Sequence, residues 1–281
     1  MNNFDITVIT PSYNMLPYLK RCVASVADQK GIAVEHIIID NMSDDGTKQW
    51  LKRNNTLKKI IEPDNGIYDA INKGLECSEG DIFCYLNCDE QYLPGVLFKI
   101  YQFFNDNKDV DIVYGNFLLI DEENNLISIK KPIKPRYYYI LSHYLYTYTC
   151  SIFFRRNIID DGYLFSTNYK TVSDALFVAN LVKENYKFGY INEYISVFTV
   201  RNNNLCFSSV AKDEQKLLKL NLPFGIRKLN FMLLFFRYAE NFLTAKYFHP
   251  KPINYNIYVN DNLKYRKEMI AKHVSPFYKQ H

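Results

Sequence analysis

Residues 62–90 read EPDNGIYDAINKGLECSEGDIFCYLNCDE. Within this stretch, residues 66–77 carry apolar side chains at helical spacing, and residues 81–87 form a short apolar run. A helix that leads into a buried strand is the repeating unit of a parallel β-sheet. Ligands of such sheets bind beyond the carboxyl ends of the strands. The stretch therefore predicts a ligand site at the polar residues 87–90 that follow the strand.

The same alternation begins upstream. Strand-like runs occupy residues 5–10, 34–40 and 58–62, and helical spacing is found at residues 16–29 and 47–54. Apolar runs joined by helices predict a βαβ arrangement with a mostly parallel sheet. Because parallel strands end at one edge, the loops at residues 11–14 and 40–46 should converge with residues 87–90.

The second half of the chain changes pattern. Residues 110–129 predict strands with a hairpin turn at Asn124-Asn125, residues 172–184 a helix and residues 187–200 a strand. The tyrosine-rich residues 137–148 fit a buried strand and loop, with a sugar-stacking platform as the alternative. From residue 208 the pattern predicts helices, including one over residues 225–248.

Composition narrows the class of protein. The 281 residues are 48% hydrophobic and 23% charged, which is typical of a globular chain. Residues 1–200 hold 20 Lys/Arg against 25 Asp/Glu, whereas residues 201–281 hold 14 against 5. An acidic body argues against a nucleic-acid partner, and the basic tail suits an anionic one.

The expected compartment is the cytoplasm. The polar start lacks a charged-then-apolar leader, and no stretch approaches the roughly 20 apolar residues of a membrane span. The six cysteines show neither metal-ligand spacing nor a short disulfide framework, which fits reduced thiols.

Several carboxylates each allow two interpretations. Asp40 ends a strand and is suited to accept hydrogen bonds from a base or ribose, while Ser43 and Asp45 are either ligand contacts or helix caps. Asp89, with an oxygen donor two residues earlier, is either a divalent-metal ligand or a helix start. Asp174 is either a helix N-terminal carboxylate favoured by the helix dipole or a general base.

The order of the motifs adds a family resemblance. TPSYN (10–14), IIIDNMSDDGT (37–47), residues 62–90, SIFFRR (151–156) and Ser173-Asp174 together resemble the family-2 inverting glycosyltransferases of the GT-A fold. The resemblance covers roughly residues 4–200 and is closest to bacterial members that build polysaccharides and lipid-linked glycans.

This resemblance implies an α/β architecture. The expected fold is Rossmann-like, with a mostly parallel central sheet flanked by helices. Residues 1–207 would form the GT-A catalytic domain, with a donor-binding half over about 1–120 and an acceptor half over about 121–207. Residues 208–281 would form a basic, aromatic, helical C-terminal extension.

The resemblance also implies roles for individual residues. The chain would move a sugar from a nucleotide-sugar donor, UDP-linked, to a hydroxyl of a glycan or lipid-linked acceptor. Asp174 would be the catalytic base, and Asp89 would ligate Mn²⁺ or Mg²⁺. The nucleotide-sugar-binding residues would be Thr10, Pro11, Tyr13, Asp40, Asp69, Asn72 and Asn87.

Four departures from the family pattern keep a second hypothesis open. Asn87 replaces the first acid of an Asp-x-Asp element, and Thr149-Cys150 replaces a His-Gln pair. Ala175-Leu176 replaces an aromatic residue and an acid, and Arg201-Asn202-Asn203-Asn204 replaces a Gly-Gly-Ser loop. The alternative is a catalytically impaired nucleotide-sugar-binding or scaffold protein of the same fold. A sugar-phosphate nucleotidyltransferase is set aside, because residues 11–14 are not a glycine-rich phosphate loop.

The tail suggests a further partner. Over residues 225–248, the polar residues fall on one helical stripe and the remaining face is rich in Phe and Leu. Such a helix with basic flanks fits an anionic membrane surface, which would make the protein peripheral on the inner face of the cell membrane. The alternative is that this face packs on the catalytic domain or on a second subunit.

Overall fold

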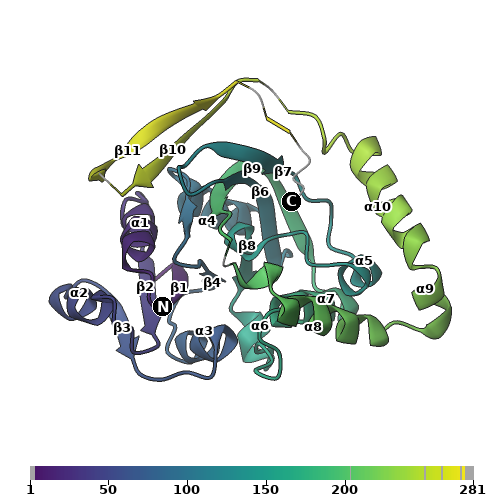
Figure 1. The fold of residues 1–281 in the computed structure, drawn as a ribbon, viewed down its shortest axis with the longest axis horizontal. Coiled ribbons are helices and arrows are strands. Elements are labelled where there is room, and N and C mark those ends of the chain that lie inside the picture. The colour runs from purple at the N-terminus through teal and green to yellow at the C-terminus, as the bar shows by residue number, and fades with distance from the viewer. Residues whose placement is uncertain (1–3, 203, 250, 261, 273, 276–281) are drawn as a thin grey trace.

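A nine-stranded sheet forms the centre of the computed structural model, which describes residues 4–202, 204–249, 251–260, 262–272 and 274–275. The strands lie in the order β3-β2-β1-β4-β8-β6-β9-β5, and β7 pairs with β6 outside this path (Figure 1). Strands β5, β7 and β8 run opposite to the other six. The bounds are β1 (Ile6–Ser12), β2 (Val34–Asp40), β3 (Lys58–Ile61), β4 (Ile82–Tyr85), β5 (Glu90–Tyr92), β6 (Ile112–Ile120), β7 (Leu126–Lys130), β8 (Ile152–Arg155) and β9 (Phe188–Thr199).

The parallel half of the sheet brings three loops to one edge, as the sequence predicts. In the β1–β2 ladder Ser12 lies opposite Asp40, and in the β1–β4 ladder Ile9 lies opposite Tyr85. The chain therefore leaves β1, β2 and β4 at nearly the same level. The loops that follow these strands meet at the carboxyl edge of the sheet.

Helices cover both faces of the sheet (Figure 1). They are α1 (Leu16–Ala27), α2 (Thr47–Arg53), α3 (Ile67–Glu76), α4 (Val96–Asp106), α5 (Tyr137–Ser142), α6 (Asn157–Asp160) and α7 (Ser173–Lys183). Helix α4 is missing from the elements expected above, although Val96, Leu97, Ile100 and Phe104 form its buried face.

Alternation along the strands divides the core into two clusters. Ile6 and Val8 of β1 point into one cluster, and Ile9 points into the other. Helix α3 packs closely on the second face at Gly74, where an added Cβ would lie only 2.6 Å from Ile9 Cγ2. The glycine of the INKG motif therefore lets the helix that carries the motif approach the sheet.

The tyrosine-rich segment is helical at its start, so the expected buried strand is wrong there. Residues Tyr137–Ser142 form α5, whose Ile140, Leu141 and Ser142 are buried, and α5 packs against α7 and α10. The high strand propensity of Tyr is overridden by this packing, because propensity is a weaker determinant than tertiary contact. The loop after α5 runs on to the short helical turn η1 (Thr149–Ser151) that precedes β8.

The tail is helical only in its first part. It contains η2 (Leu205–Phe207), α8 (Ser209–Leu220), α9 (Phe224–Lys228) and α10 (Asn230–Leu243), so the single helix expected over residues 225–248 is broken at Leu229. A two-stranded hairpin, β10 (Ile253–Val259) and β11 (Asn262–Ala271), then replaces the expected helix.

The hairpin follows a two-residue period that the basic composition of the tail obscures. Ile253, Tyr255 and Ile257 are buried, whereas Asn254 and Asn256 are exposed. The three buried side chains belong to the same hydrophobic cluster as β1 and β4. The end of the chain is thereby packed into the core of the sheet and does not form a separate core.

Arg266 attaches this hairpin to α1. Its Nε and Nη2 donate to the two carboxylate oxygens of Asp28 at 2.6 Å each, and its Nη1 and Nη2 donate to the carbonyls of Tyr92 (2.7 Å) and Ser25 (3.1 Å). The Tyr258 hydroxyl donates to Asp28 as well, at 2.9 Å. A planar guanidinium that satisfies this many acceptors is difficult to replace.

Within the described residues, no helix combines the length and hydropathy that crossing a bilayer requires. All six cysteines are free thiols.

The substitution Arg266→Ala tests how strongly the hairpin is held. It removes these bonds and leaves Asp28 without its cation, so the free energy of unfolding should fall by about 2 kcal/mol. Urea unfolding, with hydrogen exchange of β10 as a local measurement, checks this. Lys264→Ala, at an exposed site of the same strand, is the matched control and should change stability by less than about 0.5 kcal/mol. Equal stability of the two variants would contradict the assignment.

Candidate active site

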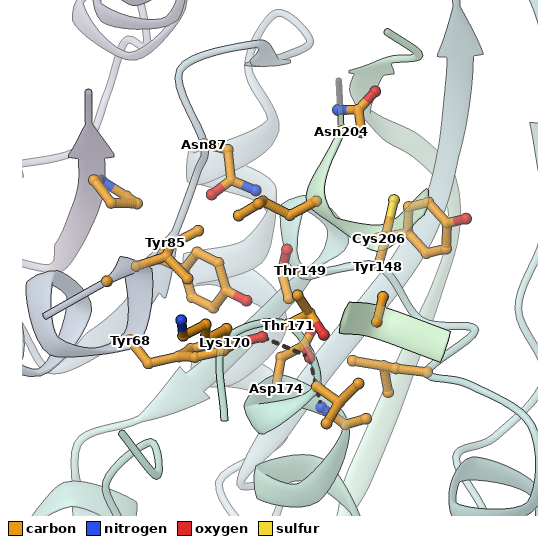
Figure 2. A pocket seen from close by; sticks show the side chains of 18 of the residues that line it. Tyr68, Tyr85, Asn87, Tyr148, Thr149, Lys170, Thr171, Asp174, Asn204 and Cys206 are labelled. Atoms are coloured by element: carbon orange, nitrogen blue, oxygen red, sulfur yellow. Dashed lines mark hydrogen bonds between the residues drawn. The ribbon is translucent and has the colours of Figure 1, made fainter. Parts of the chain in front are cut away.

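A cavity of about 1080 Å³ opens at the carboxyl edge of the sheet. Its wall on one side comes from the loops after β1, β2 and β4 and from the start of α3. On the other side it is formed by the segment between α5 and η1, the start of α7, the residues after β9, and α8. Figure 2 shows side chains from both sides converging on it.

Five of the predicted site residues line this cavity: Pro11, Tyr13, Asn87, Asp89 and Asp174. The four others, Thr10, Asp40, Asp69 and Asn72, are not part of its wall. The two acids for which the sequence predicts chemistry therefore share one cavity, although 85 residues separate them in the chain.

Asp174 lies in the first turn of α7, partly exposed to the cavity. Its Oδ1 accepts hydrogen bonds from the Tyr68 hydroxyl at 3.1 Å and from the backbone N–H of Ala175 at 2.8 Å, both drawn in Figure 2. Burial raises the pKa of this carboxyl to about 6, and the two hydrogen bonds act against that rise. A carboxylate with this pKa can take up a proton near neutral pH.

Asp89 is 8% exposed, and its Oδ2 accepts from Arg201 Nη1 at 3.3 Å and from Asn204 Nδ2 at 3.2 Å. Burial raises its pKa, and the Arg201 guanidinium opposes the rise. Asn203, in the same loop, lies outside the described residues. The Asp89 carboxylate is thus held by two side chains that follow β9.

Asn87 presents an oxygen beside it. Its backbone N–H and Nδ2 donate to the two oxygens of Glu90, at 2.8 and 3.2 Å, while its Oδ1 is buried without a hydrogen-bond partner. Burial and the neighbouring Asp89 raise the pKa of Glu90 to about 8. The orphaned Oδ1 and the Asp89 carboxylate are the hard oxygen donors that Mg²⁺ and Mn²⁺ prefer.

These donors fit a divalent metal only in part. The described residues contain no group of three or more His, Cys, Asp or Glu side chains able to enclose a metal ion. A metal held at Asn87 and Asp89 would need further oxygen ligands from water or from a bound phosphate, which is how Mg²⁺ is commonly held.

The predicted residues outside the cavity fix the shape of its loops. Asp40 is fully buried, and its oxygens accept from the Ser43 N–H (3.0 Å) and hydroxyl (2.6 Å). Thr10 is also fully buried and its hydroxyl is 2.9 Å from His36 Nε2. Asn41, the residue after Asp40, lines the cavity, and its Oδ1 accepts from the Asp64 N–H at 3.1 Å.

Asp69 and Asn72 act on neighbouring loops in the same way. Asp69 accepts from the Asn65 N–H at 2.9 Å, at the entry to α3. Asn72 makes a reciprocal pair with the backbone of Phe165, at 2.7 and 3.0 Å. Asp45 Oδ1 accepts from the Thr47 N–H at 3.1 Å at the start of α2, but the N-cap residue of this helix is Gly46.

The side chains of the cavity wall without a predicted role include Asn41, Tyr68 and Arg201. Tyr68 stands inside the EPDNGIYDAINKG motif and Asn41 directly follows the strand that ends at Asp40, so both had a positional signal. Arg201 had no local signal in the sequence apart from its place in the loop that departs from the family pattern. Its bond to Asp89 joins residues that are 112 positions apart, so no short motif contains both.

Comparison with known proteins identifies a family model and several bacterial relatives. The model of "Glycosyl transferase family 2" matches residues 7–162. Bacillus subtilis GgaB, a minor teichoic acid biosynthesis protein, is 25% identical over 75% of this chain, and TuaG of the same organism, a glycosyltransferase named for teichuronic acid biosynthesis, is 26% identical over 84%. The chain spans about a quarter or less of the length of the first curated relatives that it matches, with 24% for GgaB. It spans 95% of the length of TuaG.

Solved structures share the fold. Staphylococcus aureus TarS 1–349 in complex with UDP-GlcNAc has a TM-score of 0.58 and 14% identity over 96% of this chain and all of that one. A Pyrobaculum calidifontis mannosyltransferase in complex with GDP-Man and Mn²⁺ has a TM-score of 0.54 and 15% identity over 85% of this chain and 75% of that one.

The raised pKa of Asp174 predicts a pH-dependent cost to folding. The pKa of Asp174 in the folded state, about 6, lies above the ordinary value of an aspartate. The folded state therefore loses stability as the pH rises from that ordinary value to about 6. Asp174→Asn keeps an oxygen for the Tyr68 and Ala175 donors but cannot ionise. It should be about 2 kcal/mol more stable than the wild type at pH 8 and similar to it at pH 4.

Urea unfolding of both proteins at the two pH values measures this difference. Most other acids titrate alike in both proteins. The charge of Asp174 also raises the pKa of Glu90, so loss of that charge should stabilise the variant further at pH 8. A variant no more stable than the wild type at pH 8 would show that the Asp174 carboxylate is not destabilised by burial.

Proposed function

The chain belongs to glycosyl transferase family 2, and on this premise we propose that it transfers a sugar from a UDP-sugar to a hydroxyl of a glycan or lipid-linked acceptor, with inversion at the anomeric carbon. One observation carries the proposal: Asp174, a carboxyl with a pKa of about 6, lines the same cavity as Asp89 and the loop after β1. The UDP and UDP-GlcNAc complexes of TarS support a uridine donor.

The reaction is a single displacement. The acceptor hydroxyl gives its proton to Asp174 as its oxygen attacks the anomeric carbon, and the bond between that carbon and the diphosphate oxygen breaks on the opposite face. Tyr68 and the Ala175 N–H hold the Asp174 carboxylate in place. These two donors leave Asp174 Oδ2 available to the acceptor.

The donor would lie against the loops that follow β1, β2 and β4. Pro11, Tyr13 and Asn41 would face the nucleotide, since these residues line that end of the cavity. Asp40, Asp69 and Asn72 would contribute by fixing loops. Thr10 would contribute by joining β1 to β2, because its hydroxyl is bonded to His36. Tyr13, which is 60% exposed, is free to cover a bound base.

Asp89 and Asn87 would hold Mn²⁺ or Mg²⁺, which when bound neutralises charge on the departing nucleoside diphosphate. Arg201 and Asn204 bind one oxygen of Asp89 and so keep the carboxylate oriented. Arg201 also faces Glu122, at 3.7 Å, which gives its guanidinium a second acidic neighbour.

We also propose that α9 and α10 place the protein on an anionic membrane surface. The side chains of Phe231, Phe235 and Leu243 are 69%, 67% and 82% exposed, so the apolar face of α10 is not packed on the catalytic body. The face that meets the body instead carries Arg237, which is only 4% exposed. Arg227 and Lys228 of α9 supply basic charge at the end of this apolar surface.

Charge favours a membrane over a second subunit as the occupant. Residues 201–281 hold 14 basic against 5 acidic residues, and two such tails facing each other would repel. An anionic bilayer attracts each basic residue near its surface by about 1 kcal/mol.

Asp174→Asn should lower the turnover of UDP-sugar by about 10²- to 10⁴-fold, because it removes a positioned base. UDP release from a panel of UDP-sugars with glycan acceptors measures this. In the wild type, kcat/KM should fall about tenfold per pH unit below about 6, where Asp174 is protonated. Asp106→Asn, an exposed acid of α4, is the control and should keep full turnover.

Removal of divalent metal with EDTA should abolish wild-type turnover, and Mn²⁺ or Mg²⁺ should restore it. Asp89→Asn should not be restored. Full turnover of Asp174→Asn would overturn the role of that residue, and turnover insensitive to EDTA would overturn the metal.

Membrane docking is tested by flotation with vesicles of phosphatidylglycerol and phosphatidylcholine. The wild type should float with anionic vesicles and much less with pure phosphatidylcholine, because both basic charge and apolar area contribute. Changing Phe231, Phe235 and Phe242 to Ser should abolish flotation. The control changes Leu263, Tyr265 and Ile270, exposed on the hairpin, to Ser. Equal flotation of the two triple variants would remove the α10 assignment.

A further inference from the structure

The end of the cavity beside Asp174 is lined by lysines to which no role is assigned. Lys212, Lys216 and Lys219 follow one another at spacings of four and three residues in α8, so they share one face of that helix. All three line the cavity, and Lys170, from the segment before α7, lines it as well. Figure 1 shows α8 beside α7, away from the strands β1 and β2 that carry the donor loops.

Little negative charge balances these lysines. Lys216 pairs with Asp213 at 2.8 Å, but both side chains are mostly exposed, and such a pair is weak. Glu214 is occupied, because it accepts from the N–H groups of Lys170 and Thr171. No carboxylate of the described residues pairs with the ammonium groups of Lys170, Lys212 or Lys219.

Two buried nitrogens also lack partners, one at the end of α5, which packs on α8, and one on α10, which packs on α5. His143, at the end of α5, lines the cavity, and its Nε2 is buried without a hydrogen bond. Arg237 of α10 is 4% exposed, and its Nη1 is buried without a partner. Its guanidinium lies over the Tyr144 ring at 4.7 Å, and Tyr144 lines the cavity next to His143.

His143, Arg237 and Lys219 lie close enough for their charges to interact. Burial, then the charges of Arg237 and Lys219, lower the pKa of His143 to about 4, so this imidazole is neutral at physiological pH and can donate or accept one hydrogen bond. A buried guanidinium without a carboxylate is costly unless an anion compensates it.

We propose that α8 and the end of α5 form a subsite for a phosphate or diphosphate group carried by the acceptor. Lys170, Lys212, Lys216 and Lys219 bind its oxygens, and His143 contributes a hydrogen bond. Four ammonium groups that line the same cavity exceed what a single carboxylate needs and match a diphosphate. The proposal rests on the proposed transferase function, since the subsite would hold the acceptor hydroxyl near Asp174.

The location separates this subsite from the donor diphosphate. Thr171, three residues before Asp174, donates its hydroxyl to Glu214 of α8 at 2.6 Å, so the lysine helix is bonded to the segment that leads to the base. Asp89 and Asn87 lie on the opposite wall, after β4. An acceptor anchored at α8 would therefore approach the donor sugar from the side of Asp174.

Calorimetric titration of the full chain with inorganic pyrophosphate, in saturating UDP, tests the subsite. UDP fills the donor position, so pyrophosphate should still bind, with an affinity that falls as salt rises. Changing Lys212, Lys216 and Lys219 together to Gln should weaken pyrophosphate binding at least tenfold and leave UDP binding unchanged. The control changes Lys264, Lys267 and Lys272, which are exposed residues in or directly after β11, to Gln, for the same loss of charge, and should bind like the wild type.

Three further arms define the ligand. Farnesyl diphosphate that binds at least tenfold tighter than pyrophosphate assigns a lipid-borne diphosphate, and equal binding assigns a soluble phosphate. Glucuronate that binds as tightly as pyrophosphate overturns the phosphate assignment. Pyrophosphate that binds only without UDP, or equally to the α8 variant and the wild type, overturns the subsite. Because binding is measured without turnover, absence of transfer would count against the proposed function alone.

Discussion

The loops at the carboxyl edge of the sheet must satisfy their own polar groups, and this requirement shapes the cavity. Strands β1, β2 and β4 end inside the protein, where unpaired backbone groups are costly. Asp40 accepts from Ser43, Ser43 accepts from the Asn14 N–H at 2.8 Å, and Asn41 accepts from the Asp64 N–H. These bonds join three loops from separate parts of the chain into one wall. Tyr13 and Asn41, which line the cavity, belong to these loops.

This network explains which parts of the site could be predicted. The strands and helices of the first 90 residues, and the edge at which they meet, follow from apolar runs and motifs that are local in sequence. Which residues of these motifs can contact a ligand, and which only hold a loop in place, does not follow from the local sequence. A carboxylate that ends a strand can turn toward a ligand or back to its own loop, and Asp40 makes the second choice with Ser43. Both choices need the same residue type, so only the folded geometry distinguishes them.

The second half was harder to predict because its decisive contacts are long-range. Tyr137–Ser142 is helical because α7 and α10 pack on it, and Ile253–Ala271 is a hairpin that packs on the sheet, against a basic and aromatic composition that favoured helix. Arg201 binds the buried Asp89 across 112 residues, and Arg266 binds the partly exposed Asp28 across 238. No local spacing announces such pairs.

Charge is distributed unevenly along the cavity, and the distribution constrains how it can be used. Asp89 and Glu90 are buried and Asp174 is partly buried, within or beside its wall. Burial raises the pKa of each, so their negative charge is already costly. Apart from Lys170 and the three lysines of α8, Arg201 is the single Lys or Arg among the described lining residues, and it is engaged by Asp89. A nucleoside diphosphate that entered alone would add like charge to the donor side. It can be accommodated if a divalent cation arrives with it or if Arg201 turns from Asp89 to the diphosphate, and either event must change the bond between Arg201 and Asp89. The lysines of α8 cannot supply this charge, because they lie beyond Asp174 on the opposite wall.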